Sequence, residues 1–262
     1  MKLSNILARL KPSSKGKDSF QYRKTDVFLV SYPRSGNTWL RFIIANLQND
    51  NSAEPVDFHT VHHFVPDIEM ESGRALARNM KGPRILKTHG RHDPRIRKAV
   101  YLLRDGRDVM VSYYHYLLGQ GRIYSTFLEF LKTGPAYPCQ WQEHVTSWLG
   151  NRKKRTEILL VRYEDLLHDA FGQTKKVAKF LGLSQDDHCI QEAISKSTFA
   201  RMSQMEREKG RAHHDSTKGF RFIRKGISGD WRNYFEERHK KVFKNQANDV
   251  LIRFGYAVDR DW

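Results

Sequence analysis

The chain of 262 residues contains only two cysteines, Cys139 and Cys189. Two cysteines cannot form the disulfide framework of a small secreted domain, and the C-x-x-C spacing of many redox and zinc sites is missing. The N-terminal residues lack the apolar core of a secretory signal, so we expect a reducing, cytoplasmic location. No apolar run approaches the ~20 residues that a membrane-spanning helix needs.

Acidic side chains are also scarce relative to basic ones. The 29 Asp and Glu residues stand against 46 Lys and Arg, which gives a formal net charge of +17. This excess predicts an anionic partner: a nucleotide cofactor, a nucleic acid or an anionic lipid surface. Charge alone does not choose among these partners, and a solvated basic surface is the simplest interpretation. Hydrophobic residues at 39% are typical of a globular protein that can bury a sizeable core.

We expect a basic N-terminal arm over residues 1–25 and a single domain over residues 26–262. Apolar residues of the arm fall at helical spacing: Leu3, Ile6, Leu7 and Leu10. Such a stripe can lie on a membrane surface. It covers only about two turns, which is marginal for an isolated helix, so a frayed arm is favoured over peripheral membrane contact.

Four short apolar runs are strand candidates: residues 27–31, 83–87, 99–104 and 157–162. They alternate with segments whose apolar residues recur every three or four positions, as helices require. This alternation predicts an α/β domain with a central parallel sheet and helices on both faces. In such sheets, ligands bind beyond the carboxyl ends of the strands.

The first strand runs directly into the loop YPRSGN, residues 32–37, and an amphipathic helix follows. A strand, a glycine-containing loop and a helix N-terminus together direct backbone N–H groups at an anion. The loop also carries side-chain donors: Arg34, Ser35, Asn37 and Thr38. These features predict a site for a phosphate-like group, although the loop alone also suits an ordinary strand–turn–helix junction. It is not a Walker A loop, because no lysine precedes Thr38.

Polar residues follow the next two strand candidates. Lys87 and His89 come at the end of the second, and Arg104 ends the third. Histidine titrates near neutral pH and is suited to general-base chemistry, whereas the planar donors of arginine suit a phosphate. A lone histidine is more often structural, but the position of His89 after a buried strand favours a functional role.

A second basic segment, FIRKGISGDWRN, occupies residues 222–233. The adjacent cations Arg224 and Lys225 precede Gly226, which lets a backbone approach a phosphate closely. A nucleic-acid patch is the alternative interpretation of this basic and aromatic run. The charged segment 200–222 is expected to form a mobile flap, and segments 48–82, 115–150 and 200–222 are expected to shape a pocket.

In chain order, four segments resemble the sulfotransferases that use 3′-phosphoadenosine 5′-phosphosulfate (PAPS). They are YPRSGNTWL at 32–40, KTH at 87–89, YLLRDGRDVMVSYYHYL at 101–117 and RKGISGDW at 224–231. Shorter similarities are RYEDL at 162–166 and STF at 197–199. The resemblance implies a P-loop-like α/β fold and an enzyme that moves a sulfuryl group from PAPS to an acceptor hydroxyl.

By position, the resemblance implies that His89 is the catalytic base and that Arg34 and Lys87 stabilise charge on the transferring group. It assigns cofactor binding to a larger set: Arg34, Ser35, Gly36, Asn37, Thr38, Trp39, Arg104, Ser112, Tyr163, Ser197, Thr198, Phe199, Arg224, Lys225 and Gly226. No metal is implied. The acceptor would be a small molecule, a sugar or a lipid, and no nucleic acid is expected as a partner.

Two positions depart from the family pattern. Arg34 stands where many cytosolic members have lysine, and Asn37 replaces a common hydroxyl residue. Two other functions stay open. A P-loop nucleotide kinase is disfavoured by the missing Gly-Lys-Ser/Thr and by the lack of a clear Mg²⁺-binding aspartate. A non-catalytic binder of polyanions or nucleic acid would show a steep salt dependence of its affinity.

Overall fold

The computed structural model describes residues 20–49, 55–123, 125–150, 155–211 and 220–262. Most of the predicted arm over residues 1–25 therefore lies outside the described residues, and the division into arm and domain stays a prediction. Within the described ranges, no helix is both long and apolar enough to cross a membrane.

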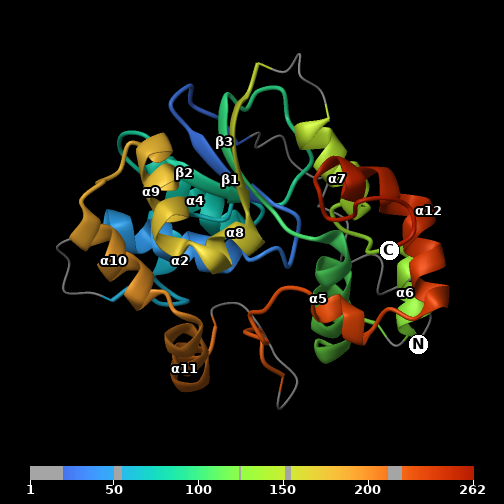
Figure 1. The fold of residues 1–262 in the computed structure, drawn as a ribbon. Coiled ribbons are helices and arrows are strands. Elements are labelled where there is room, and N and C mark those ends of the chain that lie inside the picture. Colours follow the sequence, from blue (N-terminus) through green and yellow to red (C-terminus); the bar gives the residue numbers. More distant parts are fainter. Residues whose placement is uncertain (1–19, 50–54, 124, 151–154, 212–219) are drawn as a thin grey trace.

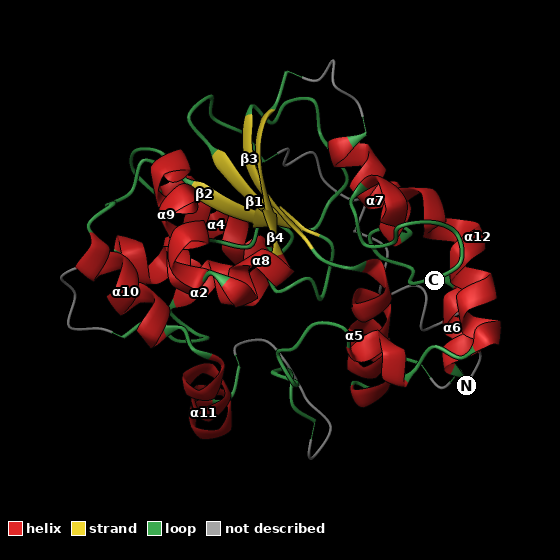
Figure 2. Ribbon diagram, viewed as in Figure 1, coloured by secondary structure: helices red, strands yellow, loops and turns green. Residues whose placement is uncertain are grey.

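Four parallel strands form one sheet in the order β2-β1-β3-β4. They are β1 (Val27–Ser31), β2 (Ile85–Thr88), β3 (Lys98–Leu103) and β4 (Glu157–Arg162). Val27 pairs with Ile85 on one side and with Lys98 on the other, so β1 is a central strand. The sheet lies between helices on its two faces (Figure 2). The predicted α/β class, parallel sheet and two-sided helix cover are confirmed.

Helices connect and follow the strands. They are α2 (Asn37–Gln48), α3 (Val61–Phe64), α4 (Glu71–Asn79), α5 (Gly106–Gly119), α6 (Phe127–Thr133), α7 (Trp141–Leu149), α8 (Tyr163–His168), α9 (Ala170–Leu181), α10 (Asp187–Lys196), α11 (Phe199–Lys209), the 3-10 helix η1 (Asp230–Asn233) and α12 (Glu237–Arg253). The first half of the predicted flap, 200–222, is therefore helical. Buried Met202 packs α11 against Phe42 and Phe58.

Alternate residues of β1 supply two separate cores. Phe28 and Val30 face the cluster formed with α5, α7 and α12. Leu29, between them, faces α2, α8 and α9. Figure 1 shows these two groups of helices on opposite sides of the sheet. Because the central strands are covered on both faces, they appear in the sequence as continuous apolar runs rather than alternating ones.

The strand order fixes where a ligand can bind. From β1 the chain crosses to β2 on one side, and it later adds β3 on the other side of β1. The connections therefore diverge between β1 and β3, which leaves a crevice beyond their carboxyl ends. The loop after β1 and the residues after β3 meet in this crevice, as the sequence predicts.

Candidate active site

A cavity of about 410 Å³ opens at the carboxyl ends of the strands, and residues after all four strands line it. Most of the predicted site residues lie on its wall: Arg34, Gly36, Asn37, Thr38, Trp39, Lys87, His89, Arg104, Ser112, Tyr163, Phe199, Arg224 and Gly226. The others lie outside this lining: Ser35, Ser197, Thr198 and Lys225. Ser197 is buried, and its hydroxyl bonds the Ala193 carbonyl oxygen. Thr198 accepts from the Arg201 N–H at the start of α11.

The loop after β1 depends on the glycine at position 36. Gly36 has a φ of 92°, and a Cβ there would lie 2.5 Å from Cδ2 of Tyr163. Only glycine combines this left-handed backbone with so close an approach to a ring. The turn ends at Asn37, the first residue of α2. The first N–H groups of a helix have no acceptor within the helix, so they are available to an anion.

Arg34 connects this loop to α5 and to the C-terminal loop. Its Nε lies 3.3 Å from the Ser112 hydroxyl and its NH2 group donates to the Phe222 carbonyl oxygen at 2.9 Å. The guanidinium also lies 4.2 Å from the centre of the Phe222 ring. Burial is the main cause that lowers the pKa of Arg34 to about 9. The Arg34 side chain is therefore engaged with Ser112 and Phe222 rather than with Lys87 or His89.

Two buried polar atoms near the loop have no hydrogen-bond partner among the described residues: the Ser35 hydroxyl and Nε of Arg104. The other nitrogens of Arg104 donate to the carbonyl oxygens of Arg34 and Ile227, at 3.1 and 2.9 Å. Arg104 also lies 4.3 Å from the centre of the Tyr163 ring. Burying a donor without a partner costs free energy, so an unpaired donor of this kind suits an anionic ligand.

The second basic segment is fixed to α5 by Asp108. Its carboxylate accepts from the N–H groups of Gly229 and Trp231, at 2.6 and 2.8 Å. Gly226 has a φ of 67°, and a Cβ there would lie 2.6 Å from the Phe199 ring. Arg224 lines the cavity and also lies 3.4 Å from Asp230, whereas Lys225 lies outside the lining and pairs with Asp230 more closely, at 2.7 Å. Asp105 is the N-cap residue of α5, and its carboxylate accepts from the Arg107 N–H.

His89 is oriented by the end of β1. Its Nδ1 lies 2.7 Å from the Ser31 carbonyl oxygen, which can only accept, so Nδ1 carries the proton. The other ring nitrogen, Nε2, is then the unprotonated one. Burial, followed by the charge of Lys87, lowers the pKa of His89 to about 4. At neutral pH the ring is therefore uncharged and can accept a proton.

Helix α7 holds the loop that carries His89. Nε2 of His144 donates to the carbonyl oxygens of His89 and Gly90, both at 3.0 Å, and its Nδ1 accepts from the Tyr101 hydroxyl at 2.8 Å. The Trp148 indole donates to the same Gly90 oxygen at 2.9 Å. The sequence analysis predicted neither residue for the site, because nothing in the sequence distinguishes His144 from a surface histidine or Trp148 from an ordinary core residue.

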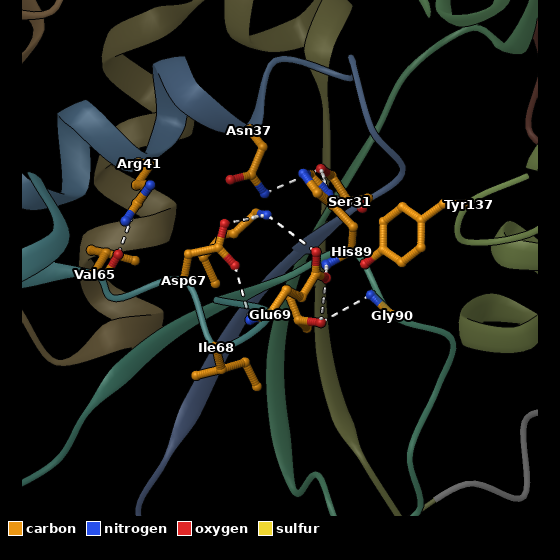
Figure 3. A network of polar contacts seen from close by, with 12 residues as sticks. Ser31, Asn37, Arg41, Val65, Asp67, Ile68, Glu69, His89, Gly90 and Tyr137 are labelled. Carbon is orange, nitrogen blue, oxygen red and sulfur yellow. Dashed lines mark hydrogen bonds and ion pairs between the residues drawn. The ribbon is translucent and has the colours of Figure 1, made fainter. Parts of the chain in front are cut away.

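The carboxylates of Asp67 and Glu69, which precede α4 in the chain, lie close to the Lys87 amino group. Asp67 accepts from this amino group at 2.8 Å, and Glu69 accepts from the Thr88 hydroxyl at 3.0 Å and from the His89 N–H. The Tyr137 hydroxyl also donates to Glu69. Figure 3 shows Asp67, Glu69 and Tyr137 around His89. The sequence predicted that segments 48–82 and 115–150 wall a pocket, but no spacing identified Asp67, Glu69 or Tyr137.

The rest of the cavity wall combines apolar side chains with tyrosines and basic groups. Its apolar part includes Phe42, Phe58, Val61, Met70 and Met202, and its further polar part includes Arg41, Tyr113, Tyr116, Arg122 and Arg211. The arrangement offers a neutral histidine, several cations and an apolar wall in one enclosed space. Such a site can bind an anionic group and an organic molecule side by side.

Comparison with known proteins identifies the class. A family model described as "Sulfotransferase domain" matches residues 24–255. Sulfotransferase 1B1 of Mus musculus is 30% identical over 263 residues, which cover 90% of this chain and 87% of that protein. Sulfotransferase 1C2 of Homo sapiens is 27% identical over 260 residues, which cover 90% of this chain and 88% of that protein.

Solved structures agree with this class. Mouse sulfotransferase SULT7A1 complexed with PAP matches with a TM-score of 0.69 at 26% identity, over 98% of this chain and 95% of that one. Retinol dehydratase in complex with androsterone and the inactive cofactor PAP matches with a TM-score of 0.66 at 25% identity, over 88% of this chain and 82% of that one.

The fold and the site thus define a sulfotransferase, and the chain belongs to the sulfotransferase family. It is a PAPS-dependent sulfotransferase. The predicted family, fold and sulfuryl transfer are confirmed.

Proposed function

We propose that this enzyme binds PAPS across the ends of β1 and β3 and that His89 activates the hydroxyl of a small molecule, sugar or lipid. One observation carries the proposal: His89, Lys87 and Arg104 line the same cavity. The unpartnered Nε of Arg104 and the buried Ser35 hydroxyl fit an anionic cofactor. A Cβ at Gly36 would collide with the Tyr163 ring, so the glycine lets the loop after β1 and this ring lie together at the proposed site.

Each part of the wall has a distinct role in this proposal. The loop after β1 binds the 5′-phosphosulfate through Ser35, Gly36, Asn37 and Thr38. The 3′-phosphate is bound by Arg104, Ser112, Arg224, Lys225 and Gly226, while Trp39, Tyr163 and Phe199 hold the adenosine part. The side chains of Ser197 and Thr198, predicted for the same role, are instead engaged with Ala193 and with the first turn of α11. Arg34 and Lys87 stabilise charge at the transferring group. In the structure Arg34 contacts Ser112 and Phe222, so it must turn away from them to take this role.

His89 acts as general base. Its unprotonated Nε2 accepts the proton of the acceptor hydroxyl, while Nδ1–H stays bonded to the Ser31 carbonyl oxygen. PAPS supplies the sulfuryl group and departs as PAP, adenosine 3′,5′-bisphosphate. The positive charge that develops on the His89 ring lies near the carboxylates of Asp67 and Glu69, which favour it. The chain supplies cations without requiring a metal in this scheme.

The acceptor is proposed to be a small organic molecule with a free hydroxyl. The apolar and tyrosine side chains of the cavity suit the body of such a molecule. The retinol dehydratase structures hold androsterone or retinol, which are small molecules of this general kind. A cytoplasmic location is part of the proposal, and the free thiols of Cys139 and Cys189 are in keeping with it.

The first test is thermal unfolding with PAP, compared with ATP–Mg²⁺ and 5′-AMP. A ligand at ~100 times its Kd should stabilise the fold by about 2.7 kcal/mol. We expect stabilisation by PAP alone, followed by transfer of labelled sulfate from PAPS to members of a panel of phenols, alcohols and sugars. A larger shift with ATP–Mg²⁺ would favour the kinase alternative. Equal stabilisation by any polyanion, with an affinity that falls steeply as the salt concentration rises, would favour the polyanion binder.

A further inference from the structure

The chain before α4 runs beside β2 like a short additional strand. The Lys87 N–H donates to the Pro66 carbonyl oxygen at 2.8 Å, and the Ile68 N–H donates to the Lys87 carbonyl oxygen at 3.1 Å. Asp67 and Lys87 therefore form a parallel bridge. Side chains at paired positions of adjacent strands project from the same face, so this pairing places the two charged groups next to one another.

The carboxylate of Asp67 is the nearest partner of Lys87. The amino group lies 2.8 Å from Asp67 and 3.7 Å from Glu69. The Lys87 and Asp67 side chains are only 8% and 13% exposed. Although burial raises it, Lys87 and then Arg41 lower the pKa of Asp67 to about 2. Asp67 is therefore charged throughout the neutral range, and its contact with Lys87 is a true ion pair.

A lysine amino group has three donors on a flexible stem of four carbons, so its position must be fixed by partners. The contact with Asp67 occupies one donor, and Lys87 still lines the cavity. A cation held in place before the reaction stabilises developing charge without reorganising during the step.

We propose that Asp67 is a positioning residue for sulfuryl transfer, and that its carboxylate holds the Lys87 amino group at the reacting end of the cavity. This inference rests on the proposed role of Lys87 in the site. Glu69 supports the neighbouring residue instead, because it accepts from the His89 N–H and the Thr88 hydroxyl. The two acids thus have different tasks: Asp67 orients the cation, and Glu69 orients the strand end that carries the base.

A positioning role has a kinetic signature that a structural role lacks. Replacing Asp67 by asparagine removes a negative charge beside an anionic cofactor, so the affinity for PAP should stay the same or increase. The loosened Lys87 should at the same time lower kcat by about 10- to 100-fold, the scale of a misplacement near 1 Å. A variant whose cavity had merely collapsed would lose both the affinity and the turnover.

The experiment compares Asp67→Asn with Glu71→Gln. Glu71 is a matched control because it lies four residues further on, is exposed and pairs with the surface residues Arg74 and Arg78. The affinity for PAP is measured by calorimetry. The value of kcat is measured at saturating PAPS, with an acceptor that the wild-type enzyme sulfates. The conservative variant Asp67→Glu, which keeps the charge, should retain more of kcat than Asp67→Asn. In a Lys87→Met background, Asp67→Asn should cause little further loss.

A lower kcat with undiminished PAP affinity, together with the loss of the effect in the Lys87→Met background, supports the proposal. Unchanged kcat, equal losses of kcat and PAP affinity, or full additivity with Lys87→Met would overturn it. If the wild-type enzyme itself neither bound PAP nor transferred sulfate, the proposed cofactor site would fail instead, so the two failures are distinguishable.

Discussion

The Nδ1 atom of His89 and the backbone carbonyl oxygen of Ser31 lie 2.7 Å apart. This contact joins the residue after β2 to the last residue of β1, so the tautomer of the proposed base is set by the pairing of two strands. The donor on Nδ1 leaves Nε2 as the acceptor. The contact explains how the sheet itself can prepare this histidine for proton transfer.

Replacing His89 by alanine should abolish most of the transfer without removing cofactor binding. General-base contributions are about 10²- to 10⁴-fold, so kcat should fall by this range while the Kd of PAP changes little. Turnover of labelled PAPS and calorimetry with PAP provide the two measurements. His188→Ala is the control, because His188 is exposed on α10 and does not line the cavity. Near-normal turnover of the His89 variant would show that another group accepts the proton.

Buried histidines should make the stability depend on pH. Burial, as the largest cause, lowers the pKa of both His89 and His144 to about 4. An unfolded histidine takes up its proton near pH 6.5, so between about pH 6.5 and 4 the unfolded state binds more protons than the folded state. The free energy of unfolding should therefore fall as the pH falls through this window, by about 1.4 kcal/mol per pH unit for each histidine.

Urea unfolding at several pH values measures this slope. The slope of the unfolding free energy against pH should be smaller for His144→Gln by the contribution of one proton, about 1.4 kcal/mol per pH unit. The variant no longer has the buried histidine whose pKa differs between the folded and unfolded states. The carboxylates are unchanged in this comparison, so their own contributions cancel in the difference between the two proteins. An identical slope in wild type and His144→Gln would contradict the assigned direction for His144.

Glycine at position 36 should be needed for both stability and cofactor binding. In Gly36→Ala, the new Cβ would combine a left-handed φ of 92° with an approach of 2.5 Å to the Tyr163 ring. Gly82→Ala is the matched control, because Gly82 has a φ of 70° and nothing within 4 Å of the added atom. We expect a loss of about 1 kcal/mol or more from the backbone strain in each variant.

The difference between the two variants isolates the collision with Tyr163. Gly36→Ala should be the less stable of the pair in urea unfolding and should also weaken PAP binding, whereas Gly82→Ala should bind PAP normally. Equal stability and equal PAP affinity in the two variants would mean that the loop adjusts freely, and the proposed role of Gly36 in cofactor binding would lose its support.

The sequence could predict those parts of the site that follow directly from strand ends. Arg34, His89 and Arg104 each come just after an apolar strand, and a parallel sheet brings such residues to one edge. Asp67 and Tyr137 could not be predicted in the same way. They come from irregular segments, and their places depend on a bridge to Lys87 and on the packing near Glu69. Neither contact leaves a periodic signal in the sequence.

The direction of a side chain was harder to predict than its position in the chain. Arg34 lies in the expected loop, but its guanidinium packs on Phe222, 188 residues away, because that ring and the Ser112 hydroxyl offer it partners. Lys225 follows Arg224 directly, yet it pairs with Asp230 outside the cavity lining. Adjacent residues in an extended loop point in different directions, so a motif alone does not tell which cation faces the ligand.

This divergence of two adjacent cations leads to the last prediction. Arg224→Ala should weaken PAP binding by about tenfold or more, since a charge-assisted contact with a phosphate is worth roughly 1.5–3 kcal/mol. Lys225→Ala should weaken it less, because Lys225 lies outside the cavity lining, is 42% exposed against 27% for Arg224, and is the closer partner of Asp230, at 2.7 Å against 3.4 Å. Calorimetry with PAP at two salt concentrations separates a local contact from a general effect of charge, because both variants remove one positive charge from the same loop. If the two substitutions weakened binding equally, net charge rather than a directed contact would explain the role of the loop. If Lys225→Ala were the more damaging, Lys225 would have to leave Asp230 when the cofactor binds.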